Sequence, residues 1–170
     1  MIKLEEPSVE LFPAYREFVL EMLARGETVW NPYTPSENEN PAEFVERILR
    51  RKENPEPPLV AETVYWPIFD GSVVGRISLR HTLNDNLRKM GGHIGYEVRP
   101  SFRRRGFATE MLRQILLTPK AREIGDLMLT CAPDNIASNR TILANGGILT
   151  QTIYVESIGA DRNHYWIRLR

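Results

Sequence analysis

Hydrophobic and polar positions repeat with two different periods along the chain, and each change of period marks a boundary between predicted elements. Apolar residues with helical spacing predict a first helix from Ser8 to about Gly26. The same spacing predicts a second helix, which Pro41 opens and the proline-rich segment 54–58 closes. The chain therefore begins with two amphipathic helices.

The middle of the chain changes to a period of two, which is typical of strands. Residues 60–69 are rich in β-branched and aromatic side chains, Asp70-Gly71 indicates a turn, and residues 73–80 alternate. These features predict a β-hairpin. A polar loop, 82–92, separates it from a third strand, 94–98, which Pro100 ends.

Helical spacing returns after Gly106 and continues to Leu116, with Pro119 just beyond the predicted end. A short apolar strand, 126–131, and a helix that starts at Asp134 or Asn135 come next. Two strands, 148–158 and 164–169, complete the order, which favours a single α+β domain over residues 1–170.

The composition excludes several classes of protein. Hydrophobic residues make up 42% and charged residues 26% of the 170 residues, as in a globular domain. Because 22 basic residues balance 22 acidic ones, neither nucleic acid nor a membrane is expected as a partner. Cys131 is the only cysteine, and no signal peptide or bilayer-length apolar run is visible, so a cytoplasmic location is expected.

One segment carries the composition of an anion site. The third strand leads through Pro100 into Arg103-Arg104-Arg105-Gly106-Phe107-Ala108 at the start of a helix. The first amides of a helix have no intrahelical partner, and the helix dipole is positive there. Glycine and alanine let a phosphate approach these amides closely, so the segment predicts a phosphate-binding turn.

Two other interpretations of the arginines stay open. They could form a solvated basic patch, or they could contact nucleic acid through Arg103–Arg105. The chain has neither a Walker motif nor the glycine-rich dinucleotide fingerprint, which disfavours those two nucleotide folds.

The pattern Arg103-x-x-Gly106-x-Ala108, placed between a strand and an amphipathic helix, resembles motif A of the GNAT superfamily of acetyl-CoA-dependent N-acetyltransferases. The segment 91–100 is similar to a bacterial branch of predicted acetyltransferases. The resemblance implies a mixed, centrally splayed β-sheet flanked by helices. It also implies that the turn and the first helical residues, including Arg104, Arg105, Phe107 and Thr109, hold the pyrophosphate of acetyl-CoA.

A second motif follows about thirty residues later. Asn135-Ile136-Ala137-Ser138 and Gly146-Gly147 resemble the next motif of the family, in which an asparagine contacts the pantetheine arm. The resemblance implies that strands 94–98 and 126–131 splay apart to admit this arm. The backbone of Tyr96, Glu97 and Val98 is then expected to bond it and to stabilise the developing oxyanion.

The resemblance implies direct attack of a primary amine, from a small molecule or a peptide, on the acetyl group of acetyl-CoA, with no metal. An ammonium must first lose a proton, and Glu97 and His93 are the candidate bases. Both alternate with the apolar face of their strand, although a bulge could exchange the faces. Glu97 could instead pair with a neighbouring arginine, Arg76, Arg80 or Arg99, and His93 could have a purely structural role.

The chain departs from the family at one position. A tyrosine often stands seven residues after the asparagine and protonates the departing thiolate, but Ile142 stands there. Tyr154, Tyr165 or water could replace it, or the chain could be a non-catalytic acyl-CoA-binding sensor. Cys131 is expected to behave as a small buried hydrophobe.

The acceptor is the least determined part. The predicted acceptor side offers a mixture of aromatic and acidic residues, which hints at a cationic amine such as an amino acid, a polyamine or an aminoglycoside. These residues are Trp30, Tyr33, Glu37, Glu39 and Trp66. A homodimer is one option for the assembly.

Overall fold

The computed structural model describes residues 1–169, apart from the side chain of Asn31, and has the expected mixture of helices and strands. The helices are α1 (Phe12–Ala24), α2 (Pro41–Arg50), α3 (Asp85–Lys89), α4 (Phe107–Leu116), α5 (Pro119–Ile124) and α6 (Ile136–Ala144). The strands are β1 (Lys3–Glu5), β2 (Glu62–Phe69), β3 (Ser72–Val73), β4 (Gly75–Arg80), β5 (Ile94–Val98), β6 (Asp126–Cys131), β7 (Ile148–Val155) and β8 (Ala160–Arg168). The α+β class predicted from the sequence is confirmed.

The strands form two sheets that meet at one end and diverge at the other. The first has the order β1-β2-β4-β5, with β3 paired to β2, and the second has the order β6-β8-β7. They join at the start of β5, where Gly92 bridges to Leu129 and the His93 amide donates to the carbonyl of Met128. Gly92 is required there, because its φ is +61° and a Cβ would lie 2.3 Å from the Met128 oxygen. Beyond this junction β5 and β6 separate, which is the expected splay.

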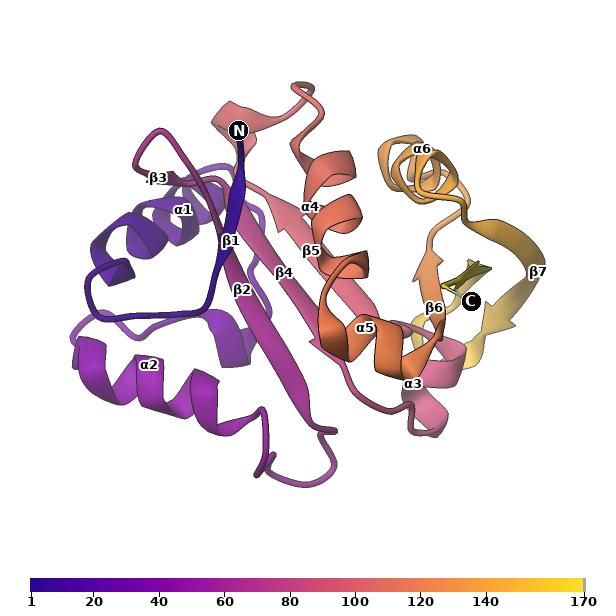
Figure 1. Ribbon diagram of the computed structural model, residues 1–170, viewed down its shortest axis with the longest axis horizontal. Helices are drawn as coiled ribbons and strands as arrows, with labels where there is room; N and C mark the ends of the chain where they lie inside the picture. Colours follow the sequence, from indigo (N-terminus) through magenta and orange to yellow (C-terminus); the bar gives the residue numbers. More distant parts are fainter. Residues whose placement is uncertain (170) are drawn as a thin grey trace.

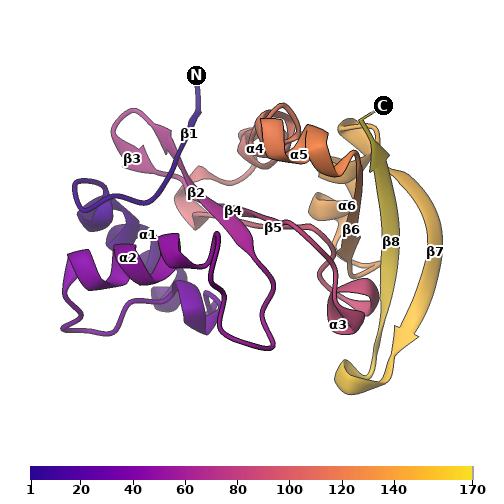
Figure 2. The same ribbon diagram turned by 60° about the horizontal axis from the view of Figure 1, so that its bottom comes forward.

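The helices cover the first sheet on both faces. Figure 2 shows α1 and α2 on one side of β2, β4 and β5, and α4 with α5 on the other. The α1–α2 side is packed by aromatic rings, in which Tyr15 stacks on Trp66 with 4.1 Å between ring centroids. Phe44 from α2 completes this cluster. Aromatic packing therefore fixes the two N-terminal helices against the sheet.

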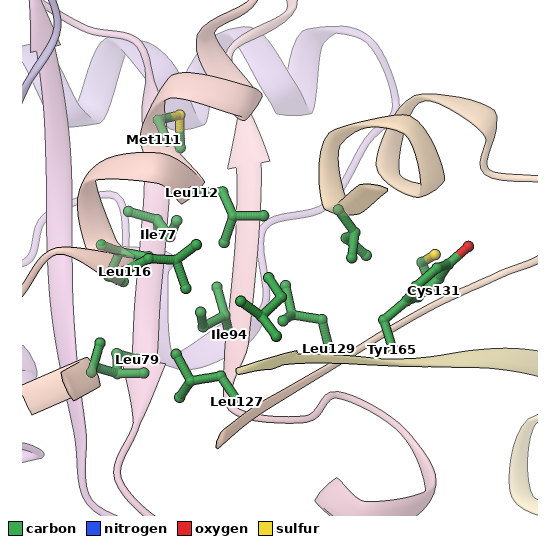
Figure 3. Close-up of a cluster of buried hydrophobic side chains, with 14 of the residues drawn as sticks. Ile77, Leu79, Ile94, Met111, Leu112, Leu116, Leu127, Leu129, Cys131 and Tyr165 are labelled. Atoms are coloured by element: carbon green, nitrogen blue, oxygen red, sulfur yellow. The ribbon is translucent and has the colours of Figure 1, made fainter. Parts of the chain in front are cut away.

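A second core connects the two sheets. Met111, Leu112 and Ile115 from α4 pack with Ile77 and Leu79 of β4 and with Leu127 and Leu129 of β6 (Figure 3). All of these side chains are fully buried or nearly so. Because one helix packs on strands of both sheets, it holds the two halves together while β5 and β6 diverge at the end where α4 begins (Figure 1).

Three short elements are absent from the sequence-based prediction. β1 adds an edge strand to β2, α3 lies inside the predicted loop, and α5 begins at Pro119, which the sequence suggested was beyond a helix end. α3 has no buried residue and α5 has one, so neither has an apolar stripe for the sequence to reveal. Among residues 1–169 no helix has the length and apolarity needed to cross a membrane.

Candidate active site

A cleft of about 760 Å³ opens where β5 and β6 separate. Four parts of the chain line it, namely the end of α1, strand β5, the turn that leads into α4, and the first two turns of α6. The lining residues are Met22, Glu27, Thr28, Tyr96, Glu97, Val98, Phe102, Arg103, Arg104, Gly106, Phe107, Ala108, Thr109, Asn135, Ala137, Ser138, Arg140 and Thr141. Eleven of the twelve residues expected to bind the cofactor are therefore on one surface, and Arg105 is the exception.

The N-terminus of α4 supplies free amides to this cleft. Gly106 is the N-cap, has a φ of +78° and has no side chain to cap the helix. By contrast, Asn40, Thr118 and Asn135 cap α2, α5 and α6 with side-chain oxygens. The amides of the first α4 residues therefore keep their donors for a ligand, and the dipole of the helix favours a negative charge there.

The three arginines before Gly106 have three different environments. Arg103 donates to the Val98 carbonyl at 2.9 Å and pairs with Glu27 at 2.6 Å, which lowers the pKa of Glu27. Arg105 lies over the rings of Phe69, Phe102 and Phe107.

Arg104 alone of the three lines the cleft without an ion-pair partner among residues 1–169. The side chains of Arg103 and Arg105 are held by these tertiary contacts, and their expected binding to the phosphates stays a prediction. Arg140, one turn into α6, is a further cation on the cleft surface that the motifs did not indicate.

The backbone of β5 offers groups to the cleft at alternate positions. The pairing of β4 with β5 is continuous from Gly75–Val98 to Leu79–Ile94, so the bulge considered from the sequence is absent. The Arg80 amide donates to His93, and the Arg99 amide donates to Val74. In this register residues 95 and 97 bond β4 through their backbone.

The backbone of Tyr96 and Val98 therefore faces the gap toward β6. The expectation that the Glu97 backbone also bonds the pantetheine is corrected, since its amide and carbonyl belong to the β4 ladder. Glu97 contributes its side chain to the cleft instead.

Two hydroxyl groups meet on the α6 side of the cleft. The side chain of Asn135 caps α6 by accepting from the Ser138 amide at 3.1 Å. The Ser138 hydroxyl lies 2.7 Å from the hydroxyl of Tyr96, which reaches across from β5. Burial raises the pKa of Tyr96 to about 12, so its hydroxyl keeps its proton at neutral pH.

These two hydroxyl groups are relevant to position 142 of α6, where the family often has a tyrosine and this chain has isoleucine. Ile142 is one turn after Ser138 on the same helix and is buried in the core. The two tyrosines considered as replacements lie elsewhere: Tyr165 donates to the Asn139 side chain, and Tyr154 is 64% exposed on β7. Tyr96 is the tyrosine that lines the cleft, and the position of its hydroxyl beside Ser138 was not anticipated from the sequence.

Glu97 points to the face of the sheet that is covered by α1 and α2. Its Oε2 accepts from Nε of Arg76 at 3.1 Å, and 23% of its side chain is exposed. Arg76 is buried, lies 3.9 Å from the centre of the Tyr33 ring, and donates to Ser78. Glu97 is therefore paired with Arg76 and also accessible. The sequence left open whether it is a base or the partner of an arginine, and this geometry is compatible with both.

His93 has its Nδ1 engaged in a structural contact. That atom accepts from the Met128 amide at 2.9 Å, and the ring is buried where the two sheets join. Burial, together with Arg80 and Arg88, lowers the pKa of His93 to about 4, so the ring is neutral at physiological pH. His93 does not line the cleft, so the geometry corresponds to its structural role rather than to catalysis.

The aromatic and acidic residues suggested for the acceptor side do not form an open acidic surface. Tyr33 and Trp66 are buried in the aromatic core, and Glu39 is held by Arg47 and the Ser36 amide. Trp30 is the exposed aromatic residue of the group, at 46%. No cluster of three or more metal-ligating side chains occurs within residues 1–169.

The cleft residues from α1 were also missed by sequence analysis. Met22, Glu27 and Thr28 are more than sixty residues from the motif, and only folding brings them to Val98 and Arg103.

Cys131 is buried, and burial raises the pKa of its thiol, as expected for a structural cysteine.

Comparison with known families and structures agrees with this geometry. Residues 7–148 match the family model described as an acetyltransferase (GNAT) domain. A search of curated protein sequences finds no significant match.

Several solved structures share the fold at low sequence identity. A microcin self-immunity acetyltransferase in complex with acetyl-CoA and AMP has a TM-score of 0.69 and 18% identity, with 99% of this chain and 92% of that chain covered. An acetyltransferase from Salmonella typhimurium that modifies the N-terminal serine of a 50S ribosomal subunit protein has a TM-score of 0.69 and 21% identity, covering 99% and 95%. An N-acetyltransferase from Staphylococcus aureus has a TM-score of 0.68 and 17% identity, covering 100% and 99%.

Proposed function

The chain belongs to the acetyltransferase (GNAT) family, and from that premise we propose that it transfers the acetyl group of acetyl-CoA to the nitrogen of a primary amine by direct attack. Acetyl-CoA dependence belongs to the family, whereas the amine and the residue roles are the proposal. The observation that carries it is the cleft itself, which joins the uncapped start of α4, the hydroxyl pair and Glu97 on one surface.

The residues fit the acyl donor at its charged end and along its arm. The free amides that follow Gly106, with Arg104 and Arg140 nearby, are suited to a pyrophosphate. The backbone of Tyr96 and the amide of Val98 are suited to the polar groups of a pantetheine, whereas the Val98 carbonyl already accepts from Arg103. Acetyl-CoA supplies an activated acetyl group on a thiol leaving group. We assign Arg105 to packing rather than to this binding.

Glu97 is the group proposed to prepare the nucleophile. Its Oε2 is held by Arg76, while its Oε1 has no protein partner among residues 1–169 and is free to accept a proton from an ammonium, directly or through water. Arg76 fixes the orientation of the carboxylate, because its guanidinium is itself held against Tyr33 and Ser78.

Tyr96 and Ser138 are proposed to receive the negative charge of the leaving group. One hydroxyl proton is used within the pair, and the other can be donated to sulfur. A tyrosine whose pKa is about 12 is a weaker acid than a thiol with an ordinary pKa of about 8.5. The hydroxyl therefore stabilises a thiolate by hydrogen bonding, and the final proton comes from solvent.

Release of free thiol from acetyl-CoA, measured against a panel of amines, tests the proposal. We expect release with at least one amine and an N-acetylated product of the corresponding mass. Glu97→Gln keeps an oxygen for Arg76 but removes the base, so it should lower kcat by roughly 100-fold or more with little change in cofactor affinity.

The alternatives give different results. Tight binding of acetyl-CoA in calorimetry without release to any amine would favour a non-catalytic sensor. Binding of nucleic acid without binding of acetyl-CoA would favour a nucleic-acid-binding domain that uses Arg103–Arg105, although Arg103 is already paired with Glu27.

Several expectations from the sequence stay predictions. These are the organisation of residues 1–170 as a single domain, the cytoplasmic location and a homodimer. The acceptor is either a small molecule or a peptide, because structures of this fold include proteins with both kinds of substrate.

A further inference from the structure

The face of the first sheet that is turned toward α1 and α2 carries a row of polar side chains. Arg76, Ser78 and Arg80 alternate onto this face from β4. Their neighbours across the ladder are Glu97 opposite Arg76, Gly95 opposite Ser78, and Glu62 of β2 opposite Arg80. The face continues from Glu97 in the cleft to Arg80 at the end of β4.

The charges on this face do not balance. Arg51 pairs with Glu62, which also accepts from the Tyr33 hydroxyl, and Arg76 pairs with Glu97. Arg80 is left with neutral partners, since its Nη1 donates to the carbonyls of Gly91 and Gly92 at 3.2 and 3.0 Å. Three guanidinium groups therefore face two carboxylates.

Arg80 has no carboxylate partner among residues 1–169, although it is largely enclosed. Burial lowers the pKa of Arg80, and the nearby charges of Arg76 and Arg51 act in the same direction against the attraction of Tyr33 and Glu62. An enclosed cation without a counter-charge is costly, and an anion bound from solution would reduce that cost.

The guanidinium of Arg80 lies flat over Gly95. A Cβ at position 95 would be 3.3 Å from Nη2 and 3.6 Å from Nη1, so any larger residue would press against the group. Gly95 is two positions before Glu97 on the same face of β5, a spacing of about 7 Å. Nη2 and Nε have no protein partner among the described residues, and the side chain is partly exposed.

We propose that Arg80 binds a carboxylate of the acceptor, so that the acceptor is a compact amine that also carries a carboxylate, such as a free amino acid. The inference rests on the proposed function, because Glu97 marks where the amine lies. The net charge of this face is a single positive one, which matches a carboxylate better than a phosphate dianion. It also disfavours polyamines and aminoglycosides, which carry only positive charge.

The test compares amino acids with their amides as acceptors. Because the amide also has a less basic α-amine, the ratio of kcat/KM within a pair is compared between the wild type and the Arg80→Gln variant, which isolates the contact with Arg80. We expect at least one amino acid to be preferred over its amide by roughly 10-fold or more, as a charge-assisted pair allows. Amides that react as well as the acids would overturn the proposal.

Variants of Arg80 and Gly95 test whether the preference for the amino acid over its amide depends on Arg80. Arg80→Gln should lower the ratio by roughly 10-fold. Gly95→Ala should reduce it without changing any charge, because the methyl group displaces the guanidinium. Arg88→Gln on α3 is the matched control, since it removes a nearby exposed arginine and should leave the ratio unchanged. A preference that survives Arg80→Gln would also contradict the proposal.

A binding measurement separates this proposal from the proposed function. The NMR signal of the Arg80 Nε–H group is followed while N-acetylglycine or N-acetylglycinamide is added to the CoA-loaded protein. A shift with the acid but not the amide supports the carboxylate site even if no amine is acetylated. Thiol release with amides and acids alike, without any shift, leaves acetyl transfer intact and rejects the site.

Discussion

The two sides of β5 are built from different parts of the chain. On the α4–α6 side, the site consists largely of backbone amides, with Gly106 chosen for its conformation and with Tyr96 and Ser138 as the main polar side chains. On the α1–α2 side, the site consists of side chains, namely the alternating guanidinium and carboxylate groups of β2, β4 and β5. In the proposed function, donor binding depends on backbone shape, whereas acceptor choice depends on side-chain charge.

The difference has a physical origin. Amides at a helix start bind any phosphate in the same way, so the donor side needs only a particular turn and a small residue. A side-chain network instead specifies one arrangement of charges, and a single substitution changes what it attracts. Binding of the donor should therefore be weakened when the backbone shape or the access to the amides is altered. The choice of acceptor should change when one charge is altered.

The largest effect is expected from a substitution that disrupts binding on the donor side. Gly106→Glu places a carboxylate at a position with a φ of +78° and open space around the Cβ, where it competes with the pyrophosphate for the amides of α4. Calorimetry with acetyl-CoA should show a Kd that rises by about 100-fold or more, which corresponds to roughly 2.7 kcal/mol.

Gly71→Glu is the control for this prediction. Gly71 has a φ of +73° and equally open surroundings, but it lies in the turn between β2 and β3. It introduces the same charge and similar backbone strain away from the cleft, so the Kd should be unchanged. An equal loss of affinity in both variants would show that strain, not the anion site, causes the effect.

A smaller effect separates the binding of the cofactor from the chemical step on the donor side. Tyr96→Phe removes one hydroxyl of the pair with Ser138 and keeps the ring in the cleft. We expect kcat to fall roughly 30-fold, the value of a lost hydrogen bond to a charged group, while the Kd for CoA changes by less than about 3-fold.

The exposed Tyr154 provides the matched substitution. Tyr154→Phe removes a hydroxyl from β7, where the side chain is 64% exposed, and should leave both constants unchanged. If Tyr96→Phe raises the Kd for CoA as much as it lowers kcat, the hydroxyl contributes to binding and not to the departure of the thiolate.

The third prediction concerns the junction that joins the two sides. The folded pKa of His93 is about 4, below its ordinary value of 6.5, so only the unfolded chain takes up a proton between these values. The stabilisation is complete above pH 6.5 and is lost as the pH falls toward 4. From pH 7 to pH 5 the free energy of unfolding should decrease by about 2 kcal/mol because of this residue.

His93→Asn tests that dependence. The asparagine oxygen can accept from the Met128 amide in place of Nδ1 but does not titrate in this range. Urea denaturation at pH 7 and pH 5 should show a smaller decrease in the variant. His81→Asn, which alters a less buried histidine bonded to Thr63, should retain most of the wild-type decrease. If His93→Asn keeps the full wild-type decrease in the free energy of unfolding between pH 7 and pH 5, His93 is excluded as the source of that decrease.

The donor side was largely predictable because its signals are local. A glycine with a helix after it and a strand before it specifies the turn by short-range geometry, and the spacing to Asn135 specifies the next helix start. The side-chain partners of Arg103 and Arg105 could not be predicted, because Glu27 and Phe69 are distant in sequence.

The acceptor side could not be predicted in the same way. The sequence suggests that Tyr33 and Trp66 contact the acceptor, but they pack into the aromatic core with α1 and α2. Arg80 was only one of three possible partners for Glu97, and the ladder register decided that Arg76 is the partner. Register is a property of strand pairing, which residue types alone do not determine.

By itself the sequence determined the order of the main elements, the α+β class, the family resemblance and the glycine turn before α4, because periodicity, turn residues and a short motif act over a few neighbouring positions. The tertiary structure decided which face Glu97 uses, that His93 joins the sheets, that Tyr96 meets Ser138, and that Arg80 lacks a counter-charge. These outcomes depend on contacts between elements that are far apart in sequence, and such contacts exist only after the core has packed.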